Sequence, residues 1–324
     1  MGIISFYHCV NSGDLLANLS GIRATCRKDN VKALIYQKID QIGHYYEGAS
    51  HPLVDGQGNM VTMTDKMLAM LKPLIMAQDY IEDVKAHDGE KFDVDLNRIH
   101  NGVFVNMPYG PIQMWPWFVF PFMRCDLSEQ WLHVPENKTL NVSGVNNKYP
   151  RKLEDCLILN FTERYRNTKI EYQFLRRYMN RLIFAGTDKE YNLFCSQWKL
   201  DIPYLQVNDF LELAQAIAGA KGFLGNQSMC WNIAEAMKVP RICEYFARAP
   251  NCFPFGKDGA LFLYQGDVEE CVMKIMNADR STLPCPVCTI SNSSSFTKSD
   301  VDYYTCKACG TIYSKYLQQE HLLF

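Results

Sequence analysis

The sequence predicts an α/β protein made of two parallel-sheet domains and a small zinc-binding module. Two blocks of alternating apolar strand patterns and amphipathic helix patterns indicate the two domains. A polar stretch at 135–152 separates these blocks. Two Cys-x-x-Cys pairs near the C-terminus indicate the zinc module. We therefore expect Rossmann-like domains at 1–150 and 151–280, followed by a zinc ribbon and tail at 281–324.

The composition favours a folded protein without a general affinity for polyanions. The chain has 324 residues, 48% of them hydrophobic, and a formal net charge of −2. The balanced charge argues against nucleic acid as a partner, although it does not exclude a local basic patch. The N-terminal MGIISFYHCV lacks the pattern of a signal peptide. The 13 cysteines are therefore interpreted as reduced thiols and metal ligands, and we expect a cytoplasmic protein. The sequence does not indicate the oligomeric state.

The longest apolar stretch, 102–123, is not expected to cross a membrane. It contains four prolines, which a simple membrane helix would not hold: Pro108, Pro111, Pro116 and Pro121. Its aromatic rings could serve a sugar or another ring as a platform, but core packing is their more frequent use. We expect a buried or cleft-lining loop here.

The first block opens with a strand, a turn and a helix. Residues 3–10 form an apolar run, NSGD follows, and apolar residues at helical spacing continue from Leu15 to Cys26. A second strand is expected at 31–37, and helical patterns at 64–86. Asp14 comes at the carboxyl end of the first strand, where open α/β sheets bind ligands, and Gly13 would let the turn close sharply. Asp14 could equally be an ordinary N-terminal helix cap. We interpret His8, inside the strand, as a core histidine.

The second block repeats the alternation more clearly. Its strands are expected at 155–162, 181–187, 222–226, 240–245 and 259–264, with helices between them that include 170–179. Arg164 and Arg166 follow the first of these strands, where a phosphate-bearing ligand would bind to their guanidinium groups. A solvated loop is the alternative interpretation of these two arginines.

A strand–turn–helix segment in the second block predicts an anion site. Gly225 ends the strand, Asn226 and Gln227 form a polar turn, and Ser228 is a natural helix cap. The free N–H groups at the start of such a helix bind anions, so a nucleotide diphosphate would lie here. The sequence contains neither a Gly-x-Gly-x-x-Gly motif nor a Walker A motif.

The C-terminal cysteines have the spacing of a structural zinc site. CPVC and CKAC hold Cys285, Cys288, Cys306 and Cys309, with 17 residues between the two pairs. Each pair can present two thiolates from one tight turn, and four thiolates close a tetrahedral Zn²⁺ site. The ribbon could bind nucleic acid or protein, or cap a domain. The single lysine between the pairs makes nucleic acid the less favoured of these roles.

Three segments together resemble the heptosyltransferase-like group of GT-B glycosyltransferases, the ADP-heptose:LPS heptosyltransferases. They are NSGDLLANLSGIRA at 11–24, FAGTDKEY at 184–191 and LGNQSMCWNIAEAMKVPRI at 224–242. The resemblance implies that Asp14 is the catalytic base, that Gly186 belongs to a glycine-rich turn and that Glu190 reaches a ribose. Asn226 stands where the family has a nucleotide-contacting aspartate, and Gln227 and Ser228 replace its Ser/Thr-Gly.

The resemblance implies inverting transfer of a sugar from a nucleotide-diphosphate sugar to an acceptor hydroxyl, without a catalytic metal. Asp14 would remove the acceptor proton, while Arg164, Arg166 and the helix start at Ser228 would stabilise the departing diphosphate. The linker at 135–152 would let the two domains close. A catalytically degenerate nucleotide- or sugar-binding scaffold is the second hypothesis, because the donor turn is altered. A nucleic-acid-modifying glycosyltransferase is the third.

Overall fold

The structure is a computed structural model of the chain, and it contains two parallel sheets and one small antiparallel sheet. It describes residues 2–43, 53–100, 110–135 and 152–277, together with the backbone of three strands between 293 and 314. The chain divides into two compact units, 1–268 and 269–324. Both parallel sheets belong to the first unit.

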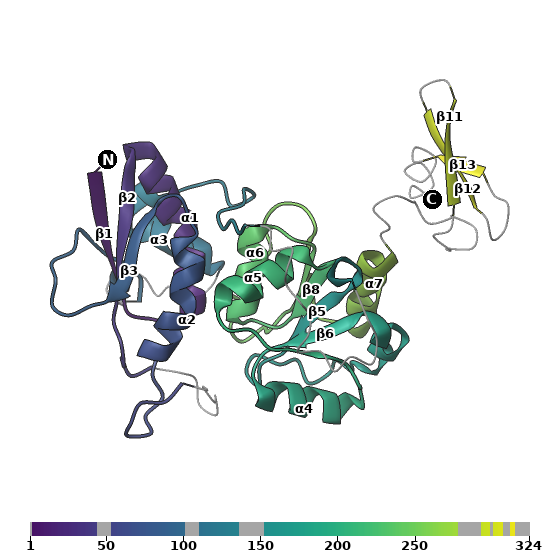
Figure 1. The fold of residues 1–324 in the computed structure, drawn as a ribbon, viewed down its shortest axis with the longest axis horizontal. Helices are drawn as coiled ribbons and strands as arrows, with labels where there is room; N and C mark the ends of the chain where they lie inside the picture. The colour runs from purple at the N-terminus through teal and green to yellow at the C-terminus, as the bar shows by residue number, and fades with distance from the viewer. Residues whose placement is uncertain are drawn as a thin grey trace. The chain divides into compact units, whose positions relative to one another are not determined.

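The first sheet has four parallel strands in the order β3-β2-β1-β4. Its strands are β1 (Gly2–His8), β2 (Val31–Gln37), β3 (Ile81–Ala86) and β4 (Val94–Asp95). Helices α1 (Ser12–Asp29) and α2 (Asp65–Met76) run alongside this sheet (Figure 1). The apolar face predicted for α1 is buried, from Leu15 to Cys26. The β1–α1–β2 order is therefore confirmed.

The expected helical stretch at 64–86 is only half right. Helix α2 ends at Met76, and residues 81–86 instead form β3, which pairs with β2. Tyr80 and Ile81 are buried just before and at the start of this strand. The helical spacing of apolar residues continues past Met76, but the edge of a parallel sheet holds the segment in an extended conformation.

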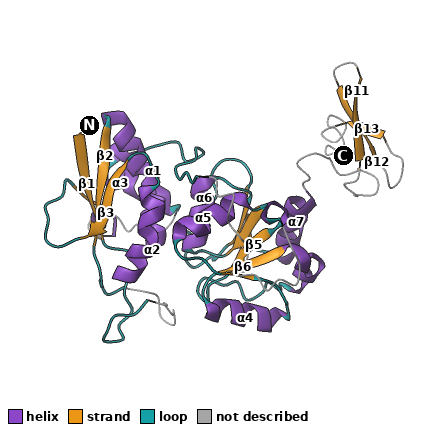
Figure 2. Ribbon diagram, viewed as in Figure 1, coloured by secondary structure: helices purple, strands orange, loops and turns teal. Residues whose placement is uncertain are grey.

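The second sheet has six parallel strands in the order β10-β9-β8-β5-β6-β7. Its strands are β5 (Leu157–Asn160), β6 (Leu182–Ala185), β7 (Tyr204–Leu205), β8 (Gly222–Gly225), β9 (Arg241–Glu244) and β10 (Gly259–Phe262). The helices of this part are α4 (Asp188–Trp198), α5 (Phe210–Gly219) and α6 (Met229–Met237), and α7 (Gln265–Asn277) runs from this unit into the next. Figure 2 shows helices around the central strands of this sheet.

Short helical turns fill several connections. They are η1 (Leu96–His100), η2 (Ile112–Met114), α3 (Trp115–Val119), η3 (Pro121–Met123), η4 (Leu153–Asp155) and η5 (Gln173–Arg181). The segment expected to be a regular helix at 170–179 is thus the 3₁₀ helix η5. The proline-rich segment forms short turns from 112 to 123, with Phe120 buried and Phe118 exposed. Its residues 102–109 lie outside the described part.

Each parallel sheet has one point where the strand order reverses, and ligands of open α/β sheets bind beyond such points. In the first sheet it lies between β1 and β4, so the β1–α1 turn and η1 flank it. In the second sheet it lies between β5 and β8. The loop at 161–169 and the turn at 226–228 flank that second point.

Trp131 forms hydrogen bonds with residues of both sheet-bearing parts of the first unit. Its backbone N–H donates to the Ala236 carbonyl in α6, and its indole N–H donates to the Leu16 carbonyl in α1, both at 3.0 Å. The Tyr80 hydroxyl donates to the Trp131 carbonyl, also at 3.0 Å. Because Trp131 is only 1% exposed, these bonds are shielded from water and fix α1 beside α6.

The third sheet is antiparallel, in the order β11-β12-β13. Its strands are β11 (Ser293–Lys298), β12 (Val301–Cys306) and β13 (Ile312–Ser314). Of the four predicted zinc ligands, Cys285, Cys288 and Cys309 lie outside the described residues. The backbone of Cys306 ends β12.

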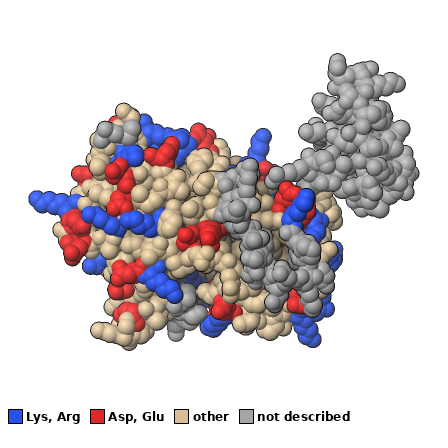
Figure 3. Space-filling model, in the orientation of Figure 1, with Lys and Arg blue, Asp and Glu red and all other residues tan. Residues whose placement is uncertain are grey.

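The surface agrees with the balanced composition. On the face shown in Figure 3, basic and acidic side chains are interspersed. No helix in the described part of the chain is long and apolar enough to span a membrane.

Candidate active site

Asp14 lies in the first turn of α1, at the carboxyl end of β1. Asn11 is extended and starts the helix through its carbonyl, which accepts from the Leu15 N–H at 3.1 Å. Burial raises the pKa of Asp14 above its ordinary value, and the neighbouring His100, Asn11 and Arg164 oppose this only in part. The carboxylate is therefore a stronger base than an exposed aspartate, and it lies near an arginine from the second sheet.

Gly13 lets the starts of two helices approach closely. A Cβ atom at this position would lie 3.0 Å from Nδ2 of Asn232 and 3.6 Å from Cα of Met229. Both neighbours belong to the first turns of α6, so a larger residue at 13 would push α1 and α6 apart. Because helix starts carry partial positive charge and free N–H groups, their approach favours a bound anion.

His8 is buried, as expected, but its ring has a partner on only one side. Nδ1 lies 2.7 Å from Oε1 of Gln37, whose Nε2 donates to the Val10 and Lys38 carbonyls. The Gln37 oxygen must therefore accept, which fixes the Nδ1–H tautomer of His8. Burial lowers the pKa of His8 to about 3, so the ring is neutral. Its Nε2 has no hydrogen-bond partner.

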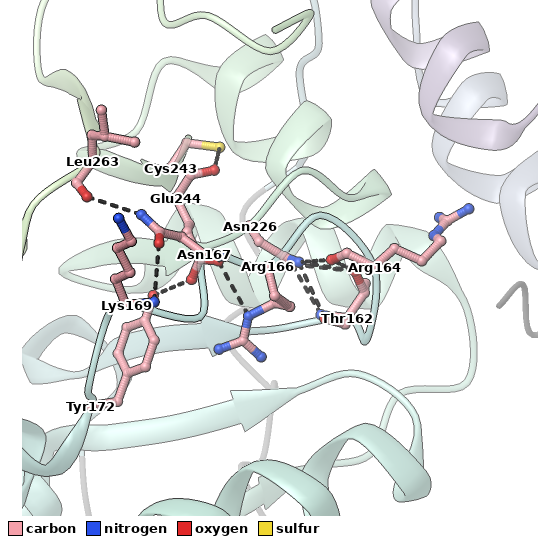
Figure 4. Close-up of polar contacts among 10 residues, drawn as sticks. All are labelled: Thr162, Arg164, Arg166, Asn167, Lys169, Tyr172, Asn226, Cys243, Glu244 and Leu263. Atoms are coloured by element: carbon pink, nitrogen blue, oxygen red, sulfur yellow. Dashed lines mark hydrogen bonds and ion pairs between the residues drawn. The ribbon is translucent and has the colours of Figure 1, made fainter. Parts of the chain in front are cut away.

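Arg164 and Arg166 leave the 162–167 loop in different directions (Figure 4). Between them, Tyr165 has a φ of 54°, in the left-handed region that bulky residues rarely adopt. The Arg164 guanidinium lies 5.3 Å from the centre of the Tyr165 ring. It lowers the pKa of both Asp14 and Glu190, against the larger effect of burial, so it lies near both carboxylates.

Glu244, at the end of β9, holds the side chain of Arg166 against the edge of the second sheet. The Nε of Arg166 lies 3.3 Å from Oε1 of Glu244, which is fully buried, and the Arg166 guanidinium lies 4.8 Å from the centre of the Phe161 ring. The Asn167 N–H and the Tyr172 hydroxyl also donate to Glu244. Arg166 therefore fastens the loop that carries Arg164, and the expected partner of this arginine, a phosphate, is here a protein carboxylate.

Asn226 bridges the point of strand-order reversal in the second sheet. Its Oδ1 accepts from the Thr162 N–H at 2.9 Å. Its Nδ2 donates to the carbonyl and hydroxyl of Thr162, at 3.2 and 3.1 Å, and to the Arg164 carbonyl. An ionised aspartate could not donate to any of these three oxygens. The Asn226 amide therefore holds the 162–167 loop against the end of β8.

The next two residues of the turn also direct their side chains inward. Gln227 donates to the Ala249 carbonyl and to Oδ1 of Asn251, both at 2.7 Å. Ser228 accepts from the Trp231 N–H at 3.2 Å, which confirms it as the cap of α6, and its hydroxyl donates to Oδ1 of Asn160 at 2.7 Å. What the turn offers a ligand is thus backbone N–H groups in the first turn of α6.

Glu190 belongs to the capping box of α4. Its Oε2 accepts from the N–H and the hydroxyl of Thr187, both at 2.9 Å, and the Thr187 hydroxyl accepts from the Glu190 N–H. Gly186 permits this arrangement, since a Cβ atom there would lie 3.0 Å from Oε2 of Glu190. Burial raises the pKa of Glu190, as it does that of Asp14.

The structure thus brings Asp14, Arg164 and Glu190 into one electrostatic neighbourhood, although they come from three distant segments. Sequence reasoning missed His100, which lies near Asp14 because η1 follows β4 beside β1. It also missed Glu244, the partner of Arg166. The position of Glu244 at the end of a predicted strand was the signal that could have found it.

The described residues contain no cluster of three histidine, cysteine or acidic side chains placed to hold a metal ion. What they provide is a half-buried carboxylate of raised pKa, a nearby guanidinium and two adjacent helix starts. This set can accept a proton and stabilise negative charge.

Comparison with solved structures finds glycosyltransferases. The E. coli ADP-heptose LPS heptosyltransferase II superposes with a TM-score of 0.54 over 85% of this chain and 98% of that chain, at 13% identity. A glycosyl transferase family 9 protein of Veillonella parvula gives a TM-score of 0.50 over 86% of this chain and 89% of that chain, at 12% identity. No family model and no curated protein sequence matches the chain. The chain therefore shares the α/β fold of these glycosyltransferases.

Proposed function

We propose that the protein is a glycosyltransferase that moves a sugar from a nucleotide-diphosphate sugar to an acceptor hydroxyl. One observation carries the proposal. Asp14 and Arg164, taken from the sequence as base and diphosphate ligand, are electrostatic neighbours across the two sheets, in a fold shared with glycosyltransferases. The resemblance of the β1–α1 turn to the heptosyltransferase-like group supports the same activity.

In the proposed reaction, Asp14 accepts the proton of the acceptor hydroxyl as that oxygen attacks the anomeric carbon of the donor. The bond between this carbon and the diphosphate oxygen breaks, and the configuration inverts. The raised pKa of Asp14 suits a general base, because it makes the carboxylate more basic while leaving it able to ionise. No step requires a metal ion.

The departing nucleoside diphosphate would be stabilised by Arg164 and by the N–H groups of Met229 and Cys230 at the start of α6. Gly13 keeps α1 close to this helix start. Glu190 and Gly186 lie on the β6 side of Arg164, where a donor ribose would bind. In this proposal four residues position the backbone around the donor and do not contact it through their side chains: Arg166, Asn226, Gln227 and Ser228.

The second candidate is a nucleotide- or sugar-binding protein without turnover. The observation that favours it is that the side chains of Asn226, Gln227 and Ser228 all bond within the protein, whereas the family's aspartate contacts the nucleotide. The two candidates make the same binding prediction and differ in catalysis.

The test is a titration of the full chain with ADP, UDP, GDP and their sugar conjugates, followed by product analysis with a panel of acceptors. The enzyme hypothesis expects one nucleotide to bind and its sugar to be transferred. Binding without transfer across the panel would favour the second candidate. Failure of every nucleotide to bind would refute both.

We further propose that 281–324 is a zinc ribbon, with Cys285, Cys288, Cys306 and Cys309 as ligands. The doubled Cys-x-x-Cys spacing supports it, and so does the short antiparallel sheet whose strand β12 ends at Cys306. Metal analysis should find about one zinc per chain. Cys285→Ser should release the metal and unfold the tail, while the thermal transition of 1–268 is kept. An ordered tail in metal-free protein would contradict this.

A further inference from the structure

The 3₁₀ helix η1 places His100 on the side that faces the β1–α1 turn. Leu96 and Ile99, three residues apart, are the buried residues of η1. Asn97 and His100 have the same spacing, and side chains three residues apart lie one above the other in a 3₁₀ helix. The thiol of Cys9, the residue that follows β1, donates to Oδ1 of Asn97 at 2.6 Å. The side of η1 that carries Asn97 and His100 is therefore next to the segment that leads into α1.

Contacts at both ends hold η1 in this position. Tyr7 of β1 pairs with Asp95 of β4, which η1 follows directly, and Oδ1 of Asp95 accepts from the Asn97 N–H at 3.0 Å. At the other end, the His100 ring meets the Trp115 ring of α3 edge to face, with 5.9 Å between the ring centres. Backbone pairing, a hydrogen bond and a ring contact thus keep the His100 ring beside the turn.

The charge of His100 acts on two side chains at this end of β1. Burial raises the pKa of Asp14, and His100 is the strongest of the neighbours that lower it. Burial and, to a smaller extent, the charge of His100 lower the pKa of His8 to about 3, so His8 is neutral. Because the interaction of charges falls off with distance, both effects agree with the contacts of η1 in placing His100 near Asp14.

The other titratable and charged groups that act on Asp14 keep one charge state near neutral pH. They are the thiols of Cys9 and Cys252, whose pKa values burial raises to about 12, and the guanidinium of Arg164. Histidine, by contrast, is the side-chain type that commonly gains or loses a charge near neutral pH. Among the described residues that act on Asp14, His100 is therefore the titrating neighbour.

We propose that His100 is a positioning residue that, when protonated, holds Asp14 in the ionised state. An imidazolium beside a carboxylate stabilises the charged form of that carboxylate. Only the charged form can accept the proton of an acceptor hydroxyl, so His100 extends the activity of the base to lower pH without touching the sugar. This inference rests on the proposed function and adds to it the residue that sets the pH range of the base.

The first measurement needs no substrate. Carbon-13 NMR of the full chain with labelled aspartate follows the Asp14 carboxyl through a pH titration, and Asp14→Asn identifies its signal. In His100→Gln, which keeps a polar side chain without the charge, Asp14 should titrate at higher pH than in the wild type. His133→Gln is the matched control, because His133 lies near Arg23 and Arg27 and is not among the groups that act on Asp14. Its Asp14 titration should match that of the wild type.

The second measurement is the pH dependence of kcat/KM for sugar transfer, with the substrates found by the nucleotide and acceptor panels. In His100→Gln the acid limb should move to higher pH, so the rate below the limb should fall about three- to tenfold while the plateau above it is kept. His100→Lys restores a positive charge and should bring the limb back to the wild-type pH or below it. A histidine that only supported the fold would lower the rate at every pH, and lysine would not rescue it.

Two results would overturn the inference. They are an Asp14 titration that is the same in His100→Gln and the wild type, and a loss of rate in His100→Gln at every pH that lysine does not repair. A shifted Asp14 titration in a chain that transfers no sugar would instead refute the proposed function and leave the pairing of His100 with Asp14 in place.

Discussion

Two strand-to-helix turns define the candidate site, and they use their side chains in opposite ways. In the β1–α1 turn, the helix has no side-chain cap, and Asp14 is left half-buried with a raised pKa. In the β8–α6 turn, Asn226, Gln227 and Ser228 all bond within the protein. The first turn thus presents a carboxyl side chain of raised pKa, and the second presents backbone N–H groups. The same local topology therefore predicts where a ligand binds, but not which atoms bind it.

Asp14→Asn should give the largest effect, because it removes the proposed general base from the first turn. We expect the transfer rate to fall by about 10²–10⁴, the range for loss of a general base. Asparagine keeps the shape of the side chain, so binding of the nucleotide should persist. The comparison of kcat with nucleotide Kd checks this, and full activity in the variant would remove Asp14 from catalysis.

The same variant should be more stable than wild type at neutral pH. Burial raises the pKa of Asp14, so the folded chain holds this proton more tightly than the unfolded chain. Stability should therefore fall as pH rises from the ordinary aspartate value of about 3.9 through the raised pKa. Asp14→Asn removes that dependence, and melts between pH 4 and 7 would show it. The rate of the wild type should rise over the same window as Asp14 ionises.

Substituting the two arginines of the 162–167 loop one at a time should separate an effect on nucleotide affinity from an effect on protein stability. Arg166→Ala leaves the buried Glu244 without its charge partner and should lower the free energy of unfolding by roughly 3 kcal/mol. Arg164→Ala should leave stability nearly unchanged but weaken nucleotide diphosphate binding by roughly 1.5–3 kcal/mol. Denaturant melts of both variants measure the change in stability, and calorimetric titration measures the change in nucleotide affinity. Equal nucleotide affinity in wild type and Arg164→Ala would exclude Arg164 from the site.

Asn226→Asp would place in the second turn the aspartate of the heptosyltransferase-like proteins that the sequence resembles, yet we expect it to lower stability. A carboxylate cannot donate to the Thr162 and Arg164 carbonyls, so unfolding free energy should fall by roughly 2 kcal/mol at pH 7. The loss should be smaller near pH 5, because a buried carboxyl beside carbonyl oxygens has a raised pKa and its protonated form can donate one bond. Urea melts at both pH values test this, with Asn226→Ala as the control that removes the bonds without adding charge.

The sequence alone predicted those features whose physical cause lies within a few neighbouring residues. Ser228 was expected to cap α6 because serine before an apolar helical pattern is a cap signal, and it does. The helix expected at 64–86 was half wrong because the sheet edge at 81–86 depends on β2, which lies far away in sequence. The pairing of Arg166 with Glu244, 78 residues apart, and the place of His100 depend on strand order and could not be read from spacing.

The smallest effect is expected from the caps of the two turns. Ser228→Ala removes the hydroxyl that accepts from the Trp231 N–H and donates to Asn160, so stability should fall by roughly 1–2 kcal/mol. Asn11 makes no such bond to the helix backbone, so Asn11→Ala should change stability by only a few tenths of a kcal/mol. Because the Asn11 side chain lowers the pKa of Asp14, its removal should instead shift the pH–rate profile to higher pH. Thermal melts of both variants and a pH–rate profile of Asn11→Ala would separate the two turns. Equal losses of stability would mean that both helices depend on their caps alike, and that the contrast between a turn that presents a side chain and a turn that presents its backbone is wrong.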